Sequence, residues 1–146
     1  MTTPPRLSLE RRFAGPPAIV YYAWTHPETM RTWIGPAGID CVHCEADVRV
    51  GGRWTFTLRE PSGELWTASG VYRELVPDRR LTYTHRWDGP QAVDTLCTVE
   101  LRDDDGETVM TFTQEAFDTV ASRDAHIDGW SQALDKLQAM LEAEMV

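Results

Sequence analysis

The sequence predicts an α+β fold in which a curved antiparallel sheet of about seven strands packs against one long C-terminal helix. Three observations support this prediction. Hydrophobic and polar side chains alternate over about 75 residues after Ile39, which is the period of strands. Short breaks rich in Gly, Pro and Asp divide this region, as in hairpins. The last segment, from about Ser122 onward, returns to helical spacing and forms the longest predicted helix.

The amino-terminal segment predicts one strand and two short helices. Residues 7–13 alternate as in a strand with one wetter face. Pro17 fits the first turn of a helix that continues to about Thr25, because proline lacks an N–H that this turn leaves unbonded anyway. A second helix is expected over residues 27–33, where the Gly- and Pro-rich residues 35–38 end it.

Six further strands are expected in the alternating region. Because they follow one another through short turns, they predict an antiparallel meander. The strands cover residues 39–49, 53–59, 66–75, 81–87, 94–102 and 108–115. The turns are Gly51-Gly52, Pro61-Ser62-Gly63, Pro77-Asp78, Asp88-Gly89-Pro90 and Asp103-Asp104-Asp105-Gly106.

The C-terminal helix carries one apolar stripe, which is expected to lie on the sheet. Ser122 is predicted to cap its first turn, and Asp124 to favour the positive end of the helix dipole. The stripe consists of Ile127, Trp130, Leu134, Leu137, Met140 and Leu141.

The period of two also predicts which face of each strand is buried. The inward sets are Trp54, Phe56 and Leu58; Leu81, Tyr83, His85 and Trp87; Cys97, Val99 and Leu101; and Met110, Phe112 and Gln114. In residues 66–75 the parity is ambiguous, and the set beginning with Trp66 is the favoured inner face. A curved sheet against one helix leaves space that aromatic rings fill loosely, as in small-molecule pockets. The alternative is that the rings simply fill the core.

Charge and composition exclude several partners. The chain carries 14 Lys and Arg against 23 Asp and Glu, a formal net charge of -9 at pH 7, which argues against affinity for nucleic-acid phosphates. No apolar run approaches the roughly 20 residues of a membrane span, and the start lacks the apolar core of a secretory signal. Three cysteines suit a reducing compartment. We therefore expect a cytoplasmic protein without membrane insertion.

The segment Cys41-Val42-His43-Cys44 has the spacing of a metal or redox motif. In an extended strand, Cys41 and His43 point to one face and Cys44 to the other, so the two thiols are not expected to converge. A second pair of ligands is also missing from the sequence. The prediction is therefore no metal site, no redox site and no cofactor.

His85 is the most interesting titratable residue, because an imidazole among inward-facing rings could position or protonate a ligand. The alternative is a core histidine that bonds a neighbour. His26 and His126 are expected to face water.

Several short segments together resemble a known family. They are residues 12–16, 23–28, 33–36, 50–54, 70–75 and 80–84, with Gly129-Trp130 followed by Leu134 and Leu137. The combination resembles the single-domain bacterial proteins of the AHSA1 type, named for the C-terminal domain of the activator of Hsp90 ATPase. These belong to the START-like, Bet v 1-like SRPBCC superfamily. The resemblance covers residues 7–141 and implies one domain over residues 1–146, with a helix-grip fold around a hydrophobic cavity.

The predicted cavity wall combines the resemblance with the inward-facing positions. Trp33 is expected at the mouth. The full set is Trp33, Trp54, Phe56, Trp66, Tyr83, His85, Trp87, Cys97, Met110, Phe112, Trp130 and Leu134. His85 stands where relatives often have an aromatic residue, which implies a more polar pocket.

Three functions compete. The favoured hypothesis is a carrier or sensor that binds a small hydrophobic or aromatic molecule. The alternative is an enzyme of the cyclase, aromatase or hydrolase kind, with His85 as acid or base and Glu74 or Tyr83 assisting. A further alternative is an Hsp90-related or other protein-interaction role; because these 146 residues show no counterpart of the additional N-terminal domain of the Hsp90 activator, co-chaperone activity is not the expected role. The family has no shared catalytic residues to carry over, and homodimerisation stays open.

Overall fold

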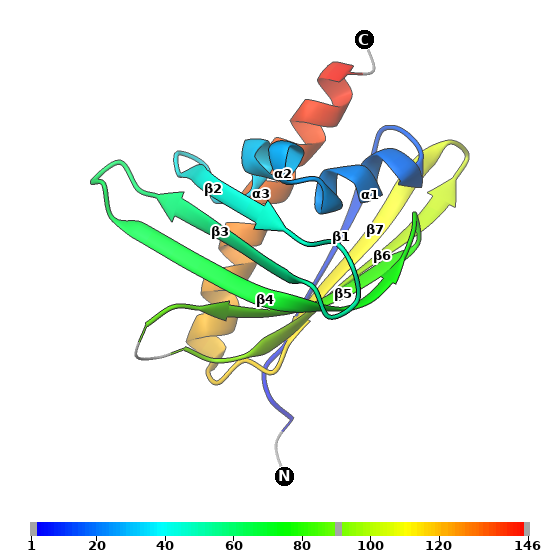
Figure 1. Cartoon of the computed structure of the whole chain (residues 1–146). Helices are drawn as coiled ribbons and strands as arrows, with labels where there is room; N and C mark the ends of the chain where they lie inside the picture. Colours follow the sequence, from blue (N-terminus) through cyan, green and yellow to red (C-terminus); the bar gives the residue numbers. More distant parts are fainter. Residues whose placement is uncertain (1–2, 90–91, 145–146) are drawn as a thin grey trace.

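Seven strands form one antiparallel sheet that curls around a long C-terminal helix (Figure 1). This computed structural model describes residues 3–89 and 92–144. Across the sheet the strand order is β1-β7-β6-β5-β4-β3-β2, so the two edge strands are β1 and β2. The elements are β1 (Leu7–Phe13), α1 (Pro17–Thr25), α2 (Pro27–Trp33), β2 (Asp40–Ala46), β3 (Arg53–Arg59), β4 (Leu65–Val76), β5 (Arg80–Trp87), β6 (Thr95–Asp104), β7 (Glu107–Glu115) and α3 (Val120–Glu144).

The predicted α+β fold and the order of its elements are confirmed. β2 to β7 form the expected meander, and β1 pairs with β7 to extend the sheet. β2 ends three residues earlier than predicted, because the chain turns at Asp47, whose N–H bonds the Arg53 carbonyl at 2.9 Å. One predicted turn, Asp88-Gly89-Pro90, includes Pro90, which lies outside the described residues.

β2 contains a β-bulge that the sequence pattern did not predict. Cys41 pairs with Leu58 and Cys44 with Phe56, with the register shifted by one residue between Cys41 and His43. The extra residue of the bulge turns Cys41 and Cys44 to the same face. The prediction that their thiols point to opposite faces is therefore wrong.

The inward sets of the central strands are buried as predicted. Trp54, Phe56 and Leu58 are 4%, 4% and 6% exposed. In β4 the set that begins with Trp66 faces inward, as favoured from the sequence. Ala68 pairs with Phe56 and Tyr72 with Tyr83, and both Ala68 and Tyr72 are buried. A register shift between Tyr72 and Glu74 then reverses the faces, which leaves Glu74 exposed and packs Leu75 against the core.

α3 begins at Val120, two residues before the predicted cap. The Oγ1 of Thr119 accepts a hydrogen bond from the Ser122 N–H at 3.0 Å, so Thr119 rather than Ser122 caps the helix. The buried side chains of α3 are Trp130, Ala133, Leu134, Leu137 and Leu141. None of the helices in the described residues is both long and apolar enough to cross a membrane.

Candidate ligand-binding cavity

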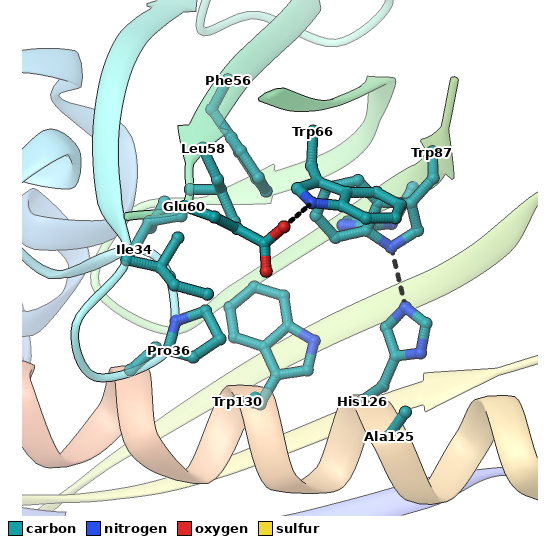
Figure 2. A pocket seen from close by; sticks show the side chains of 15 residues that line it. Ile34, Pro36, Phe56, Leu58, Glu60, Trp66, Trp87, Ala125, His126 and Trp130 are labelled. Atoms are coloured by element: carbon teal, nitrogen blue, oxygen red, sulfur yellow. Dashed lines mark hydrogen bonds between the residues drawn. The ribbon is translucent and has the colours of Figure 1, made fainter. Parts of the chain in front are cut away.

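A cavity of about 280 Å³ opens between the concave face of the sheet, α3 and the segment after α2 (Figure 2). Its volume is close to the lower end of the roughly 300–1,000 Å³ that drug-sized ligands occupy, so it suits a small molecule. The wall is formed by Ile34, Gly35, Pro36, Ile39, Phe56, Leu58, Glu60, Trp66, His85, Trp87, Ala125, His126, Gly129, Trp130 and Ala133.

The structure divides the predicted cavity residues into three groups. Phe56, Trp66, His85, Trp87 and Trp130 lie in the wall of the cavity. Trp54 and Tyr83 line a second, narrow recess of about 20 Å³. The others are buried in the core outside both walls: Trp33, Cys97, Met110, Phe112 and Leu134.

Trp33 does not lie at the mouth. Its side chain is fully buried, and its indole N–H donates to the Ala23 carbonyl at 3.1 Å. The expectation was wrong because α2 turns this residue toward α1 and not toward the opening.

Trp66 and Glu60 form the rim. Trp66 lies on the inner face of β4 and is still 46% exposed. Its indole N–H donates to the Oε2 of Glu60 at 3.0 Å, as Figure 2 shows. Glu60 was not predicted as a site residue, because it follows the alternating part of β3 and enters the wall only when the β3–β4 turn folds.

His126 is half-buried in the wall, so the prediction that it faces water is wrong. Its Nε2 accepts a hydrogen bond from the Trp87 indole N–H at 2.9 Å, and its Nδ1 lies 2.7 Å from the Ser122 carbonyl oxygen. An Nε2 that accepts cannot carry a proton, so the ring is neutral with its proton on Nδ1. Burial lowers the pKa of His126, in agreement with this state. His126 precedes Trp130 by one helical turn, and this spacing was the signal that could have placed it inward.

His85 is only 2% exposed and is surrounded by rings. Its ring centroid lies 5.3 Å from that of Trp87 and 5.4 Å from that of Trp54. Burial lowers the pKa of His85 to about 3, and the neighbouring His126 adds to this effect. The imidazole is therefore uncharged at neutral pH. Among the described residues, no hydrogen bond joins the His85 ring to another residue, and its own backbone is the one group that opposes the lowering of its pKa.

A chain of buried hydrogen bonds holds Trp130 and the backbone of His85 in place. The indole N–H of Trp130 donates to Gln114 Oε1 at 2.8 Å. Gln114 Nε2 donates to Thr95 Oγ1 at 2.8 Å, and this hydroxyl donates to the His85 carbonyl at 3.0 Å. This series of hydrogen bonds links α3 to β7, β6 and β5, so the Trp130 indole and the His85 backbone keep one orientation behind the cavity.

The wall offers little charge to a ligand. Within the part of the chain that the structure describes, it contains neither Lys nor Arg, and its ionisable groups are Glu60, His85 and His126. Both imidazoles are neutral at pH 7, as their lowered pKa values indicate. Nor do three His, Cys, Asp or Glu side chains of the described residues cluster closely enough to hold a metal ion.

The thiols that the bulge brings to one face lie outside this cavity. The Cys44 thiol donates to the Cys41 sulfur, which lowers the pKa of Cys41 to about 7, although burial opposes the change. The same hydrogen bond and burial raise the pKa of Cys44. As a thiol, Cys41 instead donates to the His43 carbonyl 3.3 Å away.

A curled antiparallel sheet that grips a long C-terminal helix, with an apolar cavity between them, defines a helix-grip protein. Residues 14–142 match the model of the family described as Activator of Hsp90 ATPase homolog 1-like protein, AHSA1, and the chain belongs to this family. The fold is consistent with the SRPBCC, Bet v 1-like superfamily, and it supports ligand binding at a coarse level.

Solved structures of similar proteins agree with this assignment. Protein CV1439 from Chromobacterium violaceum is 31% identical, with a TM-score of 0.88 over 94% of this chain and 96% of that one. A protein from Rhizobium leguminosarum is 28% identical, with a TM-score of 0.83 over 95% of each chain. The AHSA1 protein SPO3351 from Silicibacter pomeroyi is 21% identical, with a TM-score of 0.85 over 96% and 99%, and shares the fold. No curated protein matches the sequence.

Proposed function

We propose that this protein binds a small, uncharged, hydrophobic or aromatic molecule in the cavity, as a carrier or sensor. The observation that carries the proposal is an open cavity of about 280 Å³ with an aromatic and aliphatic wall that contains neither Lys nor Arg among the described residues. An apolar ligand gains free energy by leaving water for such a wall, at roughly 25 cal/mol per Å² buried.

The charges around the opening disfavour an anionic ligand. Glu60 lies at the rim, and the chain as a whole has a formal net charge of -9. An anion entering this cavity would lose its hydration and meet no cation in return, which is costly. The three cysteines are free thiols, which suits a reducing compartment, so we place this function in the cytoplasm.

The protonation state of His85 favours binding over acid–base catalysis. A general acid or base is most effective when its pKa is near the operating pH, whereas burial lowers the pKa of His85 to about 3. The two residues proposed to assist it are placed elsewhere. Glu74 is exposed on the outer side of β4, and Tyr83 lines the narrow recess.

Tryptophan fluorescence tests the proposal, because Trp66, Trp87 and Trp130 lie in the wall. A saturable response is expected to bicyclic aromatic compounds. The variant Gly129→Leu should abolish it by filling the cavity, since a Cβ at Gly129 meets only Pro36, at 3.6 Å. Ala139→Leu adds the same side chain to an exposed position of α3 and is the matched control. A wild-type protein that responds to no compound would contradict the proposal.

A further inference from the structure

The polar groups of the cavity wall are almost all engaged within the protein. The three indole N–H groups donate to protein acceptors: Trp66 to Glu60, Trp87 to His126 and Trp130 to Gln114. The Nε2 of His126 accepts from the Trp87 indole N–H, and its Nδ1–H donates to the Ser122 carbonyl. Two side chains of the wall retain hydrogen-bonding capacity for a ligand: the ring of His85 and the second carboxylate oxygen of Glu60.

The protonation of the His85 ring decides what it can offer. The backbone of His85 itself raises the pKa of its ring, which is the effect of a carbonyl oxygen that faces a ring N–H. Nδ1 is attached to Cγ, whereas Nε2 lies on the far side of the ring from the backbone, so Nδ1 is the nitrogen that can face this oxygen. A neutral imidazole has one N–H, so a proton on Nδ1 leaves Nε2 as an acceptor. His85 is 2% exposed, and its ring belongs to the cavity wall.

An unpartnered acceptor in an apolar, aromatic wall selects a ligand with a hydrogen-bond donor. We propose that the ligand is an uncharged aromatic molecule bearing a hydroxyl or N–H group, and that His85 accepts its hydrogen bond. This inference rests on the proposed function and deepens it, because it distinguishes hydroxylated aromatics from bare hydrocarbons and from carboxylates. A bare hydrocarbon leaves the acceptor unpaired, and a carboxylate meets an acceptor where it needs a donor.

Four naphthalenes of similar size test this selectivity by isothermal titration calorimetry at pH 7. 2-Naphthol offers a donor, 2-methoxynaphthalene only an acceptor, naphthalene neither, and 2-naphthoate a negative charge. We expect 2-naphthol to bind roughly five- to tenfold more tightly than naphthalene or 2-methoxynaphthalene, which is the contribution of about one hydrogen bond. 2-Naphthoate should bind most weakly of the four.

Two variants assign the preference to a residue. His85→Phe keeps a ring in the wall and removes the acceptor, so the preference for 2-naphthol over naphthalene should disappear. Glu60→Met is the contrasting variant, because it removes the other free side-chain acceptor that the described residues of the wall offer. The preference should survive this change. If Glu60→Met removes it, the hydroxyl bonds at the rim and the inference is overturned.

A measurement on the wild-type protein covers the case in which His85→Phe does not fold. The 15N resonance of His85 Nε2 should shift on addition of 2-naphthol and not on addition of naphthalene. Equal affinities for 2-naphthol and naphthalene, with no such shift, would overturn this inference and leave the proposed function standing. Absence of binding by all four compounds would overturn the proposed function, and the inference with it.

Discussion

Gly70 lies where the Trp54 side chain of β3 crosses β4 to reach the backbone of β5. Trp54 pairs with Gly70, and its indole N–H donates to the Thr84 carbonyl at 3.1 Å. A Cβ at Gly70 would lie 1.7 Å from the Thr84 oxygen and 2.7 Å from Trp54 Nε1. The absence of a side chain at Gly70 therefore allows both the close approach of the backbones and the indole hydrogen bond.

Gly70→Ala is expected to lower the free energy of unfolding by about 2–4 kcal/mol, because the backbone of β5 must move or the Trp54 hydrogen bond must break. Urea denaturation followed by tryptophan fluorescence measures this change. Gly129→Ala is the control, since its Cβ has space in α3 and alanine favours a helix by up to about 1 kcal/mol. Similar stabilities for the two variants would contradict the packing described at Gly70.

His85 also predicts how stability depends on pH. Its pKa is about 3 in the folded protein, below the ordinary value of 6.5 that the unfolded chain regains. As pH falls below 6.5 the unfolded chain takes up the proton first, so the folded state loses stability progressively toward pH 3. Burial lowers the pKa of His126 too, which adds to the same trend.

His85→Phe should therefore flatten the loss of stability between pH 6.5 and acid pH. Unfolding free energies at pH 7.0, 5.5 and 4.5 measure the slope in the wild type and the variant. His43→Phe is the control, because His43 is exposed on β2 and makes only a loose pairing with Glu45 at 3.7 Å. Parallel slopes for His85→Phe and the wild type would argue against a buried neutral imidazole.

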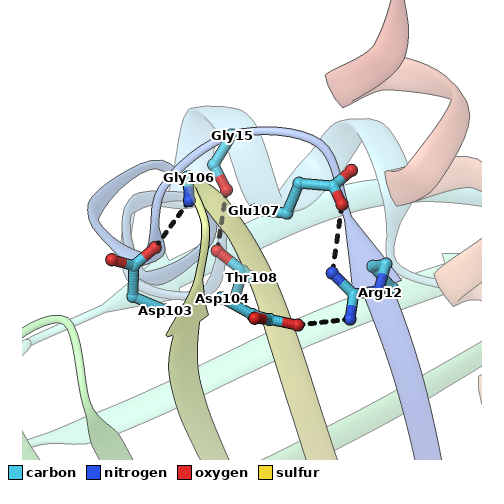
Figure 3. A network of polar contacts seen from close by, with 7 residues as sticks. All are labelled: Arg12, Gly15, Asp103, Asp104, Gly106, Glu107 and Thr108. Atoms are coloured by element: carbon cyan, nitrogen blue, oxygen red, sulfur yellow. Dashed lines mark hydrogen bonds and ion pairs between the residues drawn. The ribbon is translucent and has the colours of Figure 1, made fainter.

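Among the elements, β1 shows how an edge strand far from its partners in sequence is fastened. Arg12 of β1 pairs with Asp104 at 2.5 Å and with Glu107 at 3.0 Å, on either side of the β6–β7 turn (Figure 3). Both ion pairs are exposed to solvent, and exposed ion pairs contribute little to the free energy of unfolding. The hydroxyl of Thr108, near the start of β7, donates to the carbonyl of Gly15, just after β1, at 2.8 Å. Thr108 is fully buried, so this hydrogen bond fastens the end of β1 to β7 away from solvent.

The bulge in β2 makes a prediction about thiol chemistry. Phenylarsine oxide condenses with two adjacent thiols and releases water, so it should form one bridged adduct with Cys41 and Cys44 of the folded protein. Mass spectrometry of the intact protein should find this adduct in the wild type and in Cys97→Ser, because Cys97 is fully buried. Cys41→Ser and Cys44→Ser should each prevent it. A bridged adduct that survives either substitution would contradict the register of β2.

At the scale of the whole molecule, the cavity belongs to no single element. Its wall takes Phe56 from β3, Trp66 from β4, His85 from β5 and Trp130 from α3, and the segment around Pro36 completes it. A ligand that contacts all of these parts binds the folded state alone, so it must stabilise the entire fold.

A compound that binds in the cavity should raise the free energy of unfolding by about 2.7 kcal/mol when its free concentration is about 100 times its Kd. Thermal denaturation with and without 2-naphthol measures this as an increase in Tm. Gly129→Leu should show no increase, whereas Ala139→Leu should behave as the wild type. An equal increase in Gly129→Leu would place the compound outside the cavity.

Much of the fold could be predicted because it depends on local patterns. Alternation over residues 53–59 predicted which side chains β3 buries, and helical spacing from Ile127 to Leu141 predicted the face of α3 that meets the sheet. These periods follow from the geometry of strands and helices, and each can be followed along a single segment.

The residues of the site depend on contacts between segments, and these escaped the sequence patterns. Glu60 joins the wall through the bond from Trp66, and His126 through the bond from Trp87, a partner 39 positions away in the sequence. Cys41 and Cys44 share a face because the register of β2 against β3 slips by one residue. Trp33, Phe112 and Leu134 are as apolar as the residues of the wall, yet they are buried in the core. Their residue type therefore did not distinguish them from residues that border the cavity.

The sequence by itself thus determined the order of the elements, the faces that β3 and α3 bury and the AHSA1 family of the chain. Only the tertiary structure decided which inward rings border open space and which polar groups among them stay unpaired. The physical reason is that periodicity assigns a side chain to a face, whereas a cavity is what remains after all faces have packed. At His85, packing removed the charge and left an acceptor without a partner, and on this our proposal for the ligand rests.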